Sequence, residues 1–378
     1  MNSDLSVFSS PELRKVVQDM RELLSQNRLA FLLGAGCSKC AGLPLMPELT
    51  EKVLNHDKIS SETRELLDAV LGSFSGAPTA TIEDYLSEIV DFLSIAERRA
   101  RSGAEQPKVL VGTRESDVST LQNALEEIKD IISSAIGDAQ VSVARHQQFV
   151  RAIHNSLQAG KTTRTVDYFI LNYDTLIEDA LGLERILYSD GFTGAATGWW
   201  QHDSFRAKEN AARVFKVHGS IDWCLLEGDL LPRRVRSRIK TESTRSHVLI
   251  YPAATKYQEA QRDPFAQILQ DMRQSLIPVK GTEKVLVICG YSFGDSHIDM
   301  EIKNALHQSE GRLTIAAFVS TNEPEGSLKD WLEDPTISEQ IKVYANRGFY
   351  HGIDESKAEV ALPWWKFEVL TRLLGGER

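Results

Sequence analysis

Residues 29–38 read LAFLLGAGCS, and this stretch decides the fold of the chain. Residues 29–33 are apolar without alternation, which is typical of a central parallel strand buried on both faces. The glycines at 34 and 36 let the backbone turn sharply and approach a pyrophosphate, because a Cβ would block that approach. A helix starting after them would offer free N–H groups to an anion. We therefore predict a buried strand, a phosphate-binding loop and a helix.

Three further apolar runs end in the same way, in small and polar residues. They are residues 166–171 before Asn172-Tyr173-Asp174, residues 214–217 before His218-Gly219-Ser220, and residues 285–289 before Gly290-Tyr291-Ser292. In an open α/β sheet, ligands bind outside the carboxyl ends of the strands, so groups at separate strand ends can converge on one molecule. The four junctions together predict one nucleotide pocket.

The flanking sequence supports an α/β fold. Ser10-Pro11-Glu12 has the pattern of an N-cap, a first-position proline and a first-turn acid, and the apolar residues from Leu13 to Leu24 follow the helical period. Further strands are expected at Val248, Leu313 and Ile341. This order predicts a Rossmann-like, doubly wound parallel sheet.

The middle of the chain differs in character. Helical patterns at 61–71, 82–98, 121–136 and 145–157 come with almost no strand signal. We predict that residues 48–160 form an inserted helical subdomain, and that 1–47 and 161–378 form the α/β domain. The polar stretch 101–119 is expected to be a mobile loop.

Composition limits the class of protein. The chain has 378 residues, 42% hydrophobic and 25% charged, which is ordinary for a soluble globular protein. No apolar run approaches the ~18 to 20 residues of a membrane span, and the start lacks signal-peptide features, so we expect a cytoplasmic protein without membrane contact. A net charge of -10 argues against direct nucleic-acid binding. The basic stretch 233–240 is more typical of a solvated loop than of a partner-binding surface.

The four junctions resemble the motifs of sirtuins, in the same order. The glycine loop departs from the dinucleotide fingerprint because Lys39 replaces its third glycine. Gly34-Ala35-Gly36-Cys37-Ser38, followed by Gly42-Leu43-Pro44, is similar to the sirtuin GAG-x-S loop and G-I-P segment. Residues 172–174 resemble the N-I-D of Q-N-I-D, residues 218–220 the catalytic H-G-S, and residues 290–292 the G-T-S loop on the adenosine side.

The chain also departs from the deacylase sirtuins. Leu45-Met46-Pro47 stands where those enzymes have D-F-R, and Leu171 replaces the glutamine of Q-N-I-D. The segment directly after H-G-S, Ile221-Asp222-Trp223-Cys224, supplies a single cysteine, where sirtuins carry two cysteine pairs. Structural zinc takes four ligands, so the single pair Cys37 and Cys40 is expected to pack rather than bind, and no metal is predicted.

The whole pattern is most similar to the sirtuin-like NAD hydrolases of bacterial anti-phage defence, closest to the type associated with a HerA-type hexameric ATPase. Residues 251–257 and 362–365 are also similar to segments of that branch. The resemblance implies that NAD+ is the substrate, that the nicotinamide–ribose bond is cleaved, and that the protein forms a homo-oligomer controlled by the ATPase partner. A protein deacylase, an ADP-ribosyltransferase and a non-catalytic nucleotide sensor remain alternatives, since each uses the same pocket.

The resemblance also assigns roles to residues. We expect Asn172 to orient the water and the ribose hydroxyls, Asp174 to hold the carboxamide or offset positive charge, and His218 to act as general base. Asp295 and His297 are expected to support the site or to begin the next helix. Independently of the resemblance, residues 175–178 have the spacing of a capping box. The expected cofactor-binding residues are Gly34, Ala35, Gly36, Ser38, Gly219, Gly290, Ser292 and Asn322.

Overall fold

The computed structural model describes residues 5–26, 28–74, 80–103, 107–158, 165–236, 245–249 and 263–375. The α-helices are α1 (Pro11–Gln26), α2 (Met46–Leu54), α3 (Ser61–Leu71), α4 (Ile82–Arg101), α5 (Val118–Gly137), α6 (Ala144–Gln158), α7 (Leu176–Leu183), α9 (Phe265–Leu276), α10 (Ser296–Gln308), α11 (Gly326–Glu333) and α12 (Phe367–Leu374). Among these residues, no helix is both long and apolar enough to cross a membrane.

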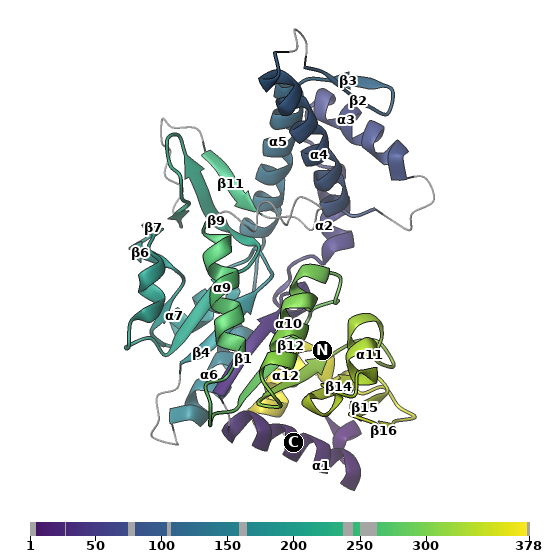
Figure 1. The fold of residues 1–378 in the computed structure, drawn as a ribbon, viewed down its shortest axis with the longest axis vertical. Coiled ribbons are helices and arrows are strands. Elements are labelled where there is room, and N and C mark those ends of the chain that lie inside the picture. Colours follow the sequence, from purple (N-terminus) through teal and green to yellow (C-terminus); the bar gives the residue numbers. More distant parts are fainter. Residues whose placement is uncertain are drawn as a thin grey trace.

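The strands form three sheets (Figure 1). They are β1 (Arg28–Leu33), β2 (Val109–Val111), β3 (Arg114–Ser116), β4 (Val166–Ile170), β5 (Tyr188–Ser189), β6 (Phe192–Gly194), β7 (Thr197–Trp200), β8 (Ala212–Lys216), β9 (Gly219–Leu226), β10 (Arg233–Val235), β11 (Arg245–Leu249), β12 (Lys284–Cys289), β13 (Leu313–Phe318), β14 (Ile341–Ala345), β15 (Gly348–His351) and β16 (Asp354–Lys357).

The predicted parallel sheet is confirmed. Its nine strands run in the order β16-β15-β14-β13-β12-β1-β4-β8-β5, and all neighbours from β14 to β5 are parallel. Two antiparallel strands, β15 and β16, extend one edge. The chain moves outward from β1 to β4 and β8 and later returns to place β12 beside β1. The strand order therefore reverses at β1, the position where such sheets bind ligands.

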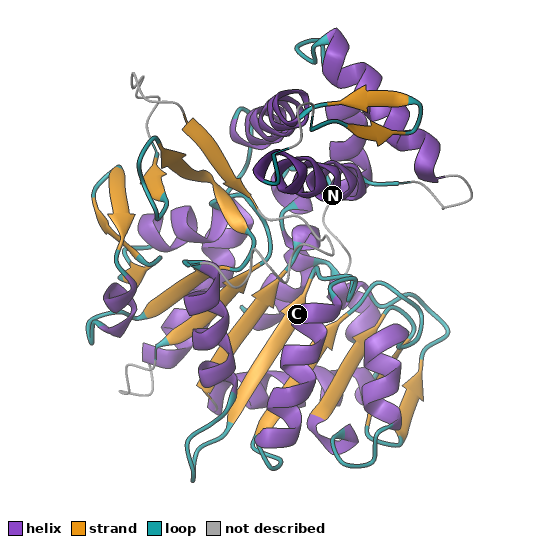
Figure 2. Cartoon of the chain, turned by 45° about the horizontal axis from the view of Figure 1, so that its top comes forward, coloured by secondary structure: helices purple, strands orange, loops and turns teal. Residues whose placement is uncertain are grey.

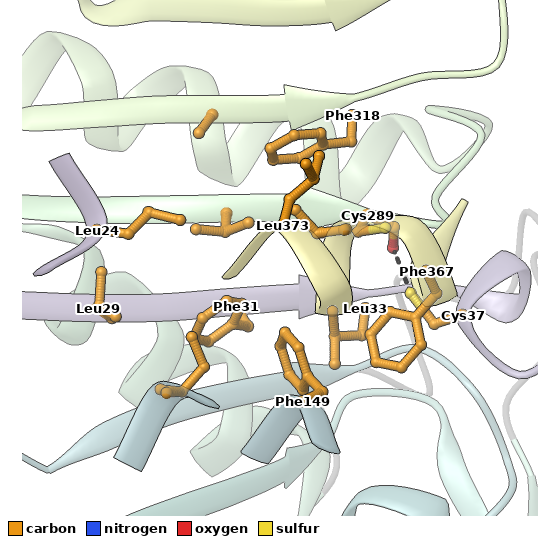
Figure 3. Close-up of a cluster of buried hydrophobic side chains, with 14 of the residues drawn as sticks. Leu24, Leu29, Phe31, Leu33, Cys37, Phe149, Cys289, Phe318, Phe367 and Leu373 are labelled. Atoms are coloured by element: carbon orange, nitrogen blue, oxygen red, sulfur yellow. Dashed lines mark hydrogen bonds between the residues drawn. The ribbon is translucent and has the colours of Figure 1, made fainter. Parts of the chain in front are cut away.

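Helices cover both faces of this sheet (Figure 2). Phe31 points into a core built with α1, α6, α7 and α12, whereas its neighbour Leu32 points into a second core built with α9, α10 and α11. Figure 3 shows the first core, where Phe31 packs edge-on against Phe149 of α6 with ring centroids 5.1 Å apart. Helix α1, predicted from its cap and apolar spacing, lies on this face.

The region 48–160 is largely helical, with two differences from the sequence prediction. Helices α2 to α5 share their own core, but α6 contributes Phe149, Val150 and Ile153 to the core of the large sheet. The stretch predicted as a mobile loop contains the hairpin β2–β3, with Val109 and Val111 buried. Three-residue strands alternate too briefly to be recognised in a polar stretch.

A second sheet, antiparallel and five-stranded, was not predicted. Its order is β11-β9-β10-β7-β6, and the strand expected at Val248 belongs here rather than to the large sheet. Phe192, Trp200 and Trp223 pack from this sheet into the core beside α9. Strands β6, β7 and β10 have only three or four residues, and β6 and β7 contain glycine, so their sequence pattern is weak. Residues 251–257, part of the resemblance, lie outside the described residues.

Candidate functional site

The sheet brings the four predicted junctions to the same edge. Leu33 is in register with Ile170 on one side and with Cys289 on the other, and Ile170 is in register with Lys216. The N–H of Leu171 donates to Leu33 O, and the N–H of Val217 donates to Ile170 O, both at 3.0 Å. The loops that start after these residues therefore leave the sheet at one level.

The glycine loop packs directly against the loop after β12. A Cβ on Gly34 would lie 2.4 Å from Gly290 O, and one on Gly36 would lie 2.7 Å from Gly290 Cα. Gly290 itself has a φ of +66°, and its Cβ would lie 2.4 Å from the amide nitrogen of Cys37. These glycines are needed for contact between two loops at the point where the strand order reverses.

The helix expected directly after the glycine loop is not a regular α-helix. Two 3-10 turns, Ala35–Cys37 and Lys39–Ala41, follow instead. The N–H groups of Gly36, Cys37 and Ser38 donate to Gly290 O, Gly34 O and Ala35 O, each at 3.0 Å. Ala35 and Gly36 are exposed. The tight loop-to-loop contact leaves no room for a regular helix start, so its amides bond within the protein.

Three predicted site residues form one hydrogen-bonded group. Asn172 Nδ2 donates to Ser38 Oγ at 2.7 Å and to Gly34 O at 3.0 Å, and Ser38 Oγ donates to Asp174 Oδ2 at 2.6 Å. Ser38 and Asp174 are buried. Asn172 Oδ1 is also buried and has no hydrogen-bond partner among the described residues. This group thus presents one unused acceptor.

The capping box predicted at residues 175–178 does not form. Asp174 Oδ1 accepts from the N–H of Leu176 at 3.1 Å, while Thr175 Oγ1 donates to Asp179. Glu178 is instead buried, with Oε1 3.9 Å from Lys216 Nζ. Burial raises the pKa of Glu178 to about 7, although Lys216 acts in the opposite direction. Lys216 Nζ also donates to Asp174 O, which fixes the turn that carries Asp174.

Tyr173 links the site to the helical insertion, a role that the sequence did not reveal. Its side chain is 8% exposed and belongs to the core formed by α2 to α5. Its backbone oxygen accepts from the N–H of Ile221 at 2.9 Å and from Ser220 Oγ at 3.2 Å. The only sequence signal is an aromatic residue between two polar ones. Tyr173 therefore joins the 172–174 loop, the 218–220 loop and the insertion.

His218 pairs with Asp295 from the loop after β12. His218 Nε2 lies 3.0 Å from Asp295 Oδ2, and their side chains are 12% and 9% exposed. Asp295 stands at the N-cap position of α10, where the sequence placed a helix start. Gly219, directly after His218, is buried and begins β9. This contact between His218 and Asp295 was not predicted from the sequence.

The two remaining predicted residues lie on exposed loops. Ser292 follows Gly290 and is exposed. Asn322 lies beyond β13, two strands from β1, and its Oδ1 accepts from Asn346 Nδ2 at 3.0 Å. The structure thus joins Ser38, Asn172 and Asp174 directly, and places Ser292 and Asn322 farther along the same edge.

Where the basic stretch is described, its residues 233–235 form strand β10 rather than a solvated loop. Arg234 is buried and donates to Asp190 and to Ala195 O, while Arg233 pairs with Asp229 at 2.8 Å. Arg236 pairs with Asp222 at 3.0 Å. These three charges are met by acids of the same chain. Arg238 and Lys240 lie outside the described residues.

The four cysteines are free thiols. Cys37 Sγ donates to Cys289 O at 3.2 Å inside the core, as drawn in Figure 3, and burial raises the pKa of the Cys37 thiol well above its usual value. Cys37 therefore packs as predicted. Across the part of the chain that is described, no three His, Cys, Asp or Glu side chains are grouped to hold a metal ion.

The arrangement of motifs agrees with a comparison of the sequence with protein families. Residues 167–339 match the family model of the SIR2-like domain. The matched SIR2-like region runs from β4 past β13 and contains Asn172, Asp174, His218 and Ser292. The glycine loop at residues 34–38 precedes it. The similarity to the SIR2-like domain thus covers residues 167–339, and β1 and the glycine loop lie outside the matched range.

Solved structures of Sir2 proteins show similarity to this chain at low identity. One, described as the structural basis for the mechanism and regulation of Sir2 enzymes, is 11% identical, covers 95% of each chain and has a TM-score of 0.41. A histidine-to-asparagine mutant of a Sir2 homologue in complex with ADP-ribose is 12% identical, covers 94% of each chain and has a TM-score of 0.39. No sequence match was found among curated proteins.

Proposed function

We propose that the protein is an NAD+ glycohydrolase, which cleaves NAD+ to nicotinamide and ADP-ribose. The observation that carries this proposal is the unused acceptor Asn172 Oδ1, which is buried while Asn172 Nδ2 donates to both Ser38 and Gly34. A buried acceptor without a partner costs about 1–3 kcal/mol, so this oxygen favours a ligand hydroxyl or water as its donor. The match to the SIR2-like domain supports NAD+ as that ligand.

The chemistry suits the residues at this edge of the sheet. Nicotinamide leaves NAD+ as a neutral molecule when the C–N bond breaks, because the bonding electron pair returns to the ring nitrogen. The ribose carbon becomes oxocarbenium-like, as in glycoside hydrolysis. Water then adds to that carbon and loses one proton, first to the imidazole of His218 and then to solvent. Asn172 Oδ1 orients the water and the ribose hydroxyls, and the carboxylate of Asp174 offsets the positive charge.

The direct test is to incubate the purified full-length protein with NAD+ and to separate nicotinamide and ADP-ribose by chromatography. We expect both products from the wild type and less than about one hundredth of that rate from Asn172→Ala and His218→Ala. His351→Ala, which removes an imidazole bonded to Glu339 O, is the matched control and should keep full turnover. A folded wild type that binds NAD+ without releasing nicotinamide would make the protein a sensor instead.

The reaction class needs its own experiment. An acyl-lysine peptide is added to the same assay, and both the peptide mass and the rate of nicotinamide release are followed. For a hydrolase we expect neither to change. Deacylation of the peptide, or transfer of ADP-ribose to a protein, would replace hydrolysis as the activity.

We also propose that this activity depletes NAD+ during anti-phage defence, in a cytoplasmic homo-oligomer regulated by a HerA-type hexameric ATPase. This part is supported by the resemblance of the motifs alone. Co-expression followed by size-exclusion chromatography tests the association, and separate elution of the two proteins would contradict it. NAD+ turnover with and without the ATPase then shows whether the partner releases or restrains the activity.

A further inference from the structure

The pair His218–Asp295 is the end of a longer chain of contacts. The hydroxyl of Tyr291 accepts from the N–H of Asp295 at 3.1 Å and donates to Asp299 Oδ1 at 2.9 Å. Ser327 Oγ, from the first turn of α11, donates to Asp299 Oδ2 at 2.5 Å. The carboxylate that faces His218 is therefore held on a backbone that is itself tied to α10 and α11.

From this chain we infer that Asp295 is a positioning residue for His218, and that Tyr291 holds Asp295 in place. The inference rests on the proposed function, because it assigns roles around the general base of that reaction. Asp295 and Tyr291, both in the 290–295 loop, act through His218 and do not touch the reacting atoms.

The geometry argues for positioning rather than for simple helix capping. A cap serves the first turn of its own helix, but Asp295 Oδ2 reaches His218, which lies on a different strand end. A carboxylate beside one imidazole nitrogen fixes the ring orientation and favours the proton on that nitrogen. With the proton on Nε2, the lone pair of the neutral ring is on Nδ1, the nitrogen that accepts a proton in general-base catalysis.

The geometry also argues against a movable latch. A latch in which the loop itself moves aside to admit substrate needs a loose backbone, whereas both the N–H and the C=O of Asp295 lie 3.1 Å from the Tyr291 hydroxyl. Burial raises the pKa of Tyr291 well above its ordinary value, so the hydroxyl keeps its proton at neutral pH. The anchor therefore persists under working conditions.

The test compares Asp295→Asn and Tyr291→Phe with a matched control, Asp271→Asn. Asp271, on α9, has its Oδ2 2.8 Å from Nε2 of His202 in the 3-10 turn His202–Arg206, and this partly buried pair is of the same type. With NAD+ as substrate, we expect kcat to fall about ten- to a hundred-fold in Asp295→Asn and less in Tyr291→Phe, with KM within about threefold of the wild type. Asp271→Asn should keep the wild-type kcat.

The inference is wrong if kcat of Asp295→Asn is unchanged, because the pair would then be only a structural contact. It is also wrong if kcat rises, because Asp295 would then act as a latch. A second readout does not need turnover. In protein labelled with ¹⁵N histidine, the NMR signals of His218 are identified by their loss in His218→Gln. Asp295→Asn should move these signals away from the pattern of a ring protonated on Nε2. Asp271→Asn should leave them in place. If the wild type does not cleave NAD+, the proposed function fails, and an unchanged His218 spectrum in Asp295→Asn would still overturn the positioning role.

Discussion

His218 and Asp295 are 3.0 Å apart although their strands, β8 and β12, are separated in the sheet by β1 and β4. Neighbouring strands lie roughly 4.8 Å apart, so the axes of β8 and β12 are about 14 Å apart. The two loops must therefore reach toward each other across the ends of β1 and β4, where Ser38 and Asn172 lie. This contact joins the loops after β8 and β12, which lie on either side of the loops after β1 and β4.

Gly290→Ala should disrupt the junction of the two loops. The new Cβ would meet the Cys37 amide at 2.4 Å in a backbone with φ +66°, so we expect a loss of more than about 1 kcal/mol in the free energy of unfolding. Gly294→Ala in the same loop is the control, because its nearest contact would be Ser292 Oγ at 3.4 Å. Chemical denaturation measures both, and equal stabilities would refute the packing role of Gly290.

Tyr173→Leu should impair the site as well as the insertion. It removes an aromatic side chain from the core of α2 to α5 and loosens the loop between Asn172 and Asp174, so we expect lower stability and a lower kcat for NAD+. Tyr85→Leu in the same core, on α4, should lower stability alone. Both are assayed well below their unfolding temperatures. Equal turnover in the two variants would show that Tyr173 does not connect the insertion to the site.

Glu178→Gln should change how stability depends on pH. The pKa of Glu178 is about 7 when folded against an ordinary 4.5, so the folded state loses stability as pH rises through this range. The variant should therefore gain stability relative to the wild type between about pH 5 and about pH 8, by roughly 3 kcal/mol at most. Urea midpoints at several pH values measure this gain. Glu51→Gln, on the exposed side of α2, should follow the wild-type curve, and a parallel curve for Glu178→Gln would contradict the assignment.

Arg234→Met should destabilise the protein strongly. It removes the closer cation from the buried carboxylate of Asp190, which keeps the N–H of Phe192 at 3.2 Å and Arg236 at 3.6 Å. Breaking a buried ion pair costs about 3–5 kcal/mol. Arg206→Met removes a pair with Asp203 whose side chains are 74% and 69% exposed, and should cost under about 1 kcal/mol. Thermal unfolding compares the two. Near-equal melting temperatures would contradict the structural role of Arg234 and would favour a partner-binding role for the basic stretch.

Several features of the site could be predicted from the sequence because they depend only on neighbouring residues in the chain. A buried strand followed by small or polar residues marks a strand end wherever it occurs, so residues 34–38, 172–174, 218 and 290 were placed at strand ends from the sequence. The hairpin β2–β3 and the strands β6, β7 and β10 of the small antiparallel sheet were missed, because strands of three or four residues carry too little alternation. Residues 175–178 have the spacing of a capping box but do not form one, because the side chain of Glu178 is buried beside Lys216.

The sequence by itself determined the parallel sheet and the order of its junctions, because burial on both faces forces a continuous apolar run and a turn forces small residues after it. Only the tertiary structure decided which groups meet. The packing of Gly34 and Gly36 against Gly290, the seat of Tyr173 in the insertion, and the pairing of His218 with Asp295 each join residues more than forty positions apart. Such contacts depend on how strands are ordered in space, and no local pattern encodes that order.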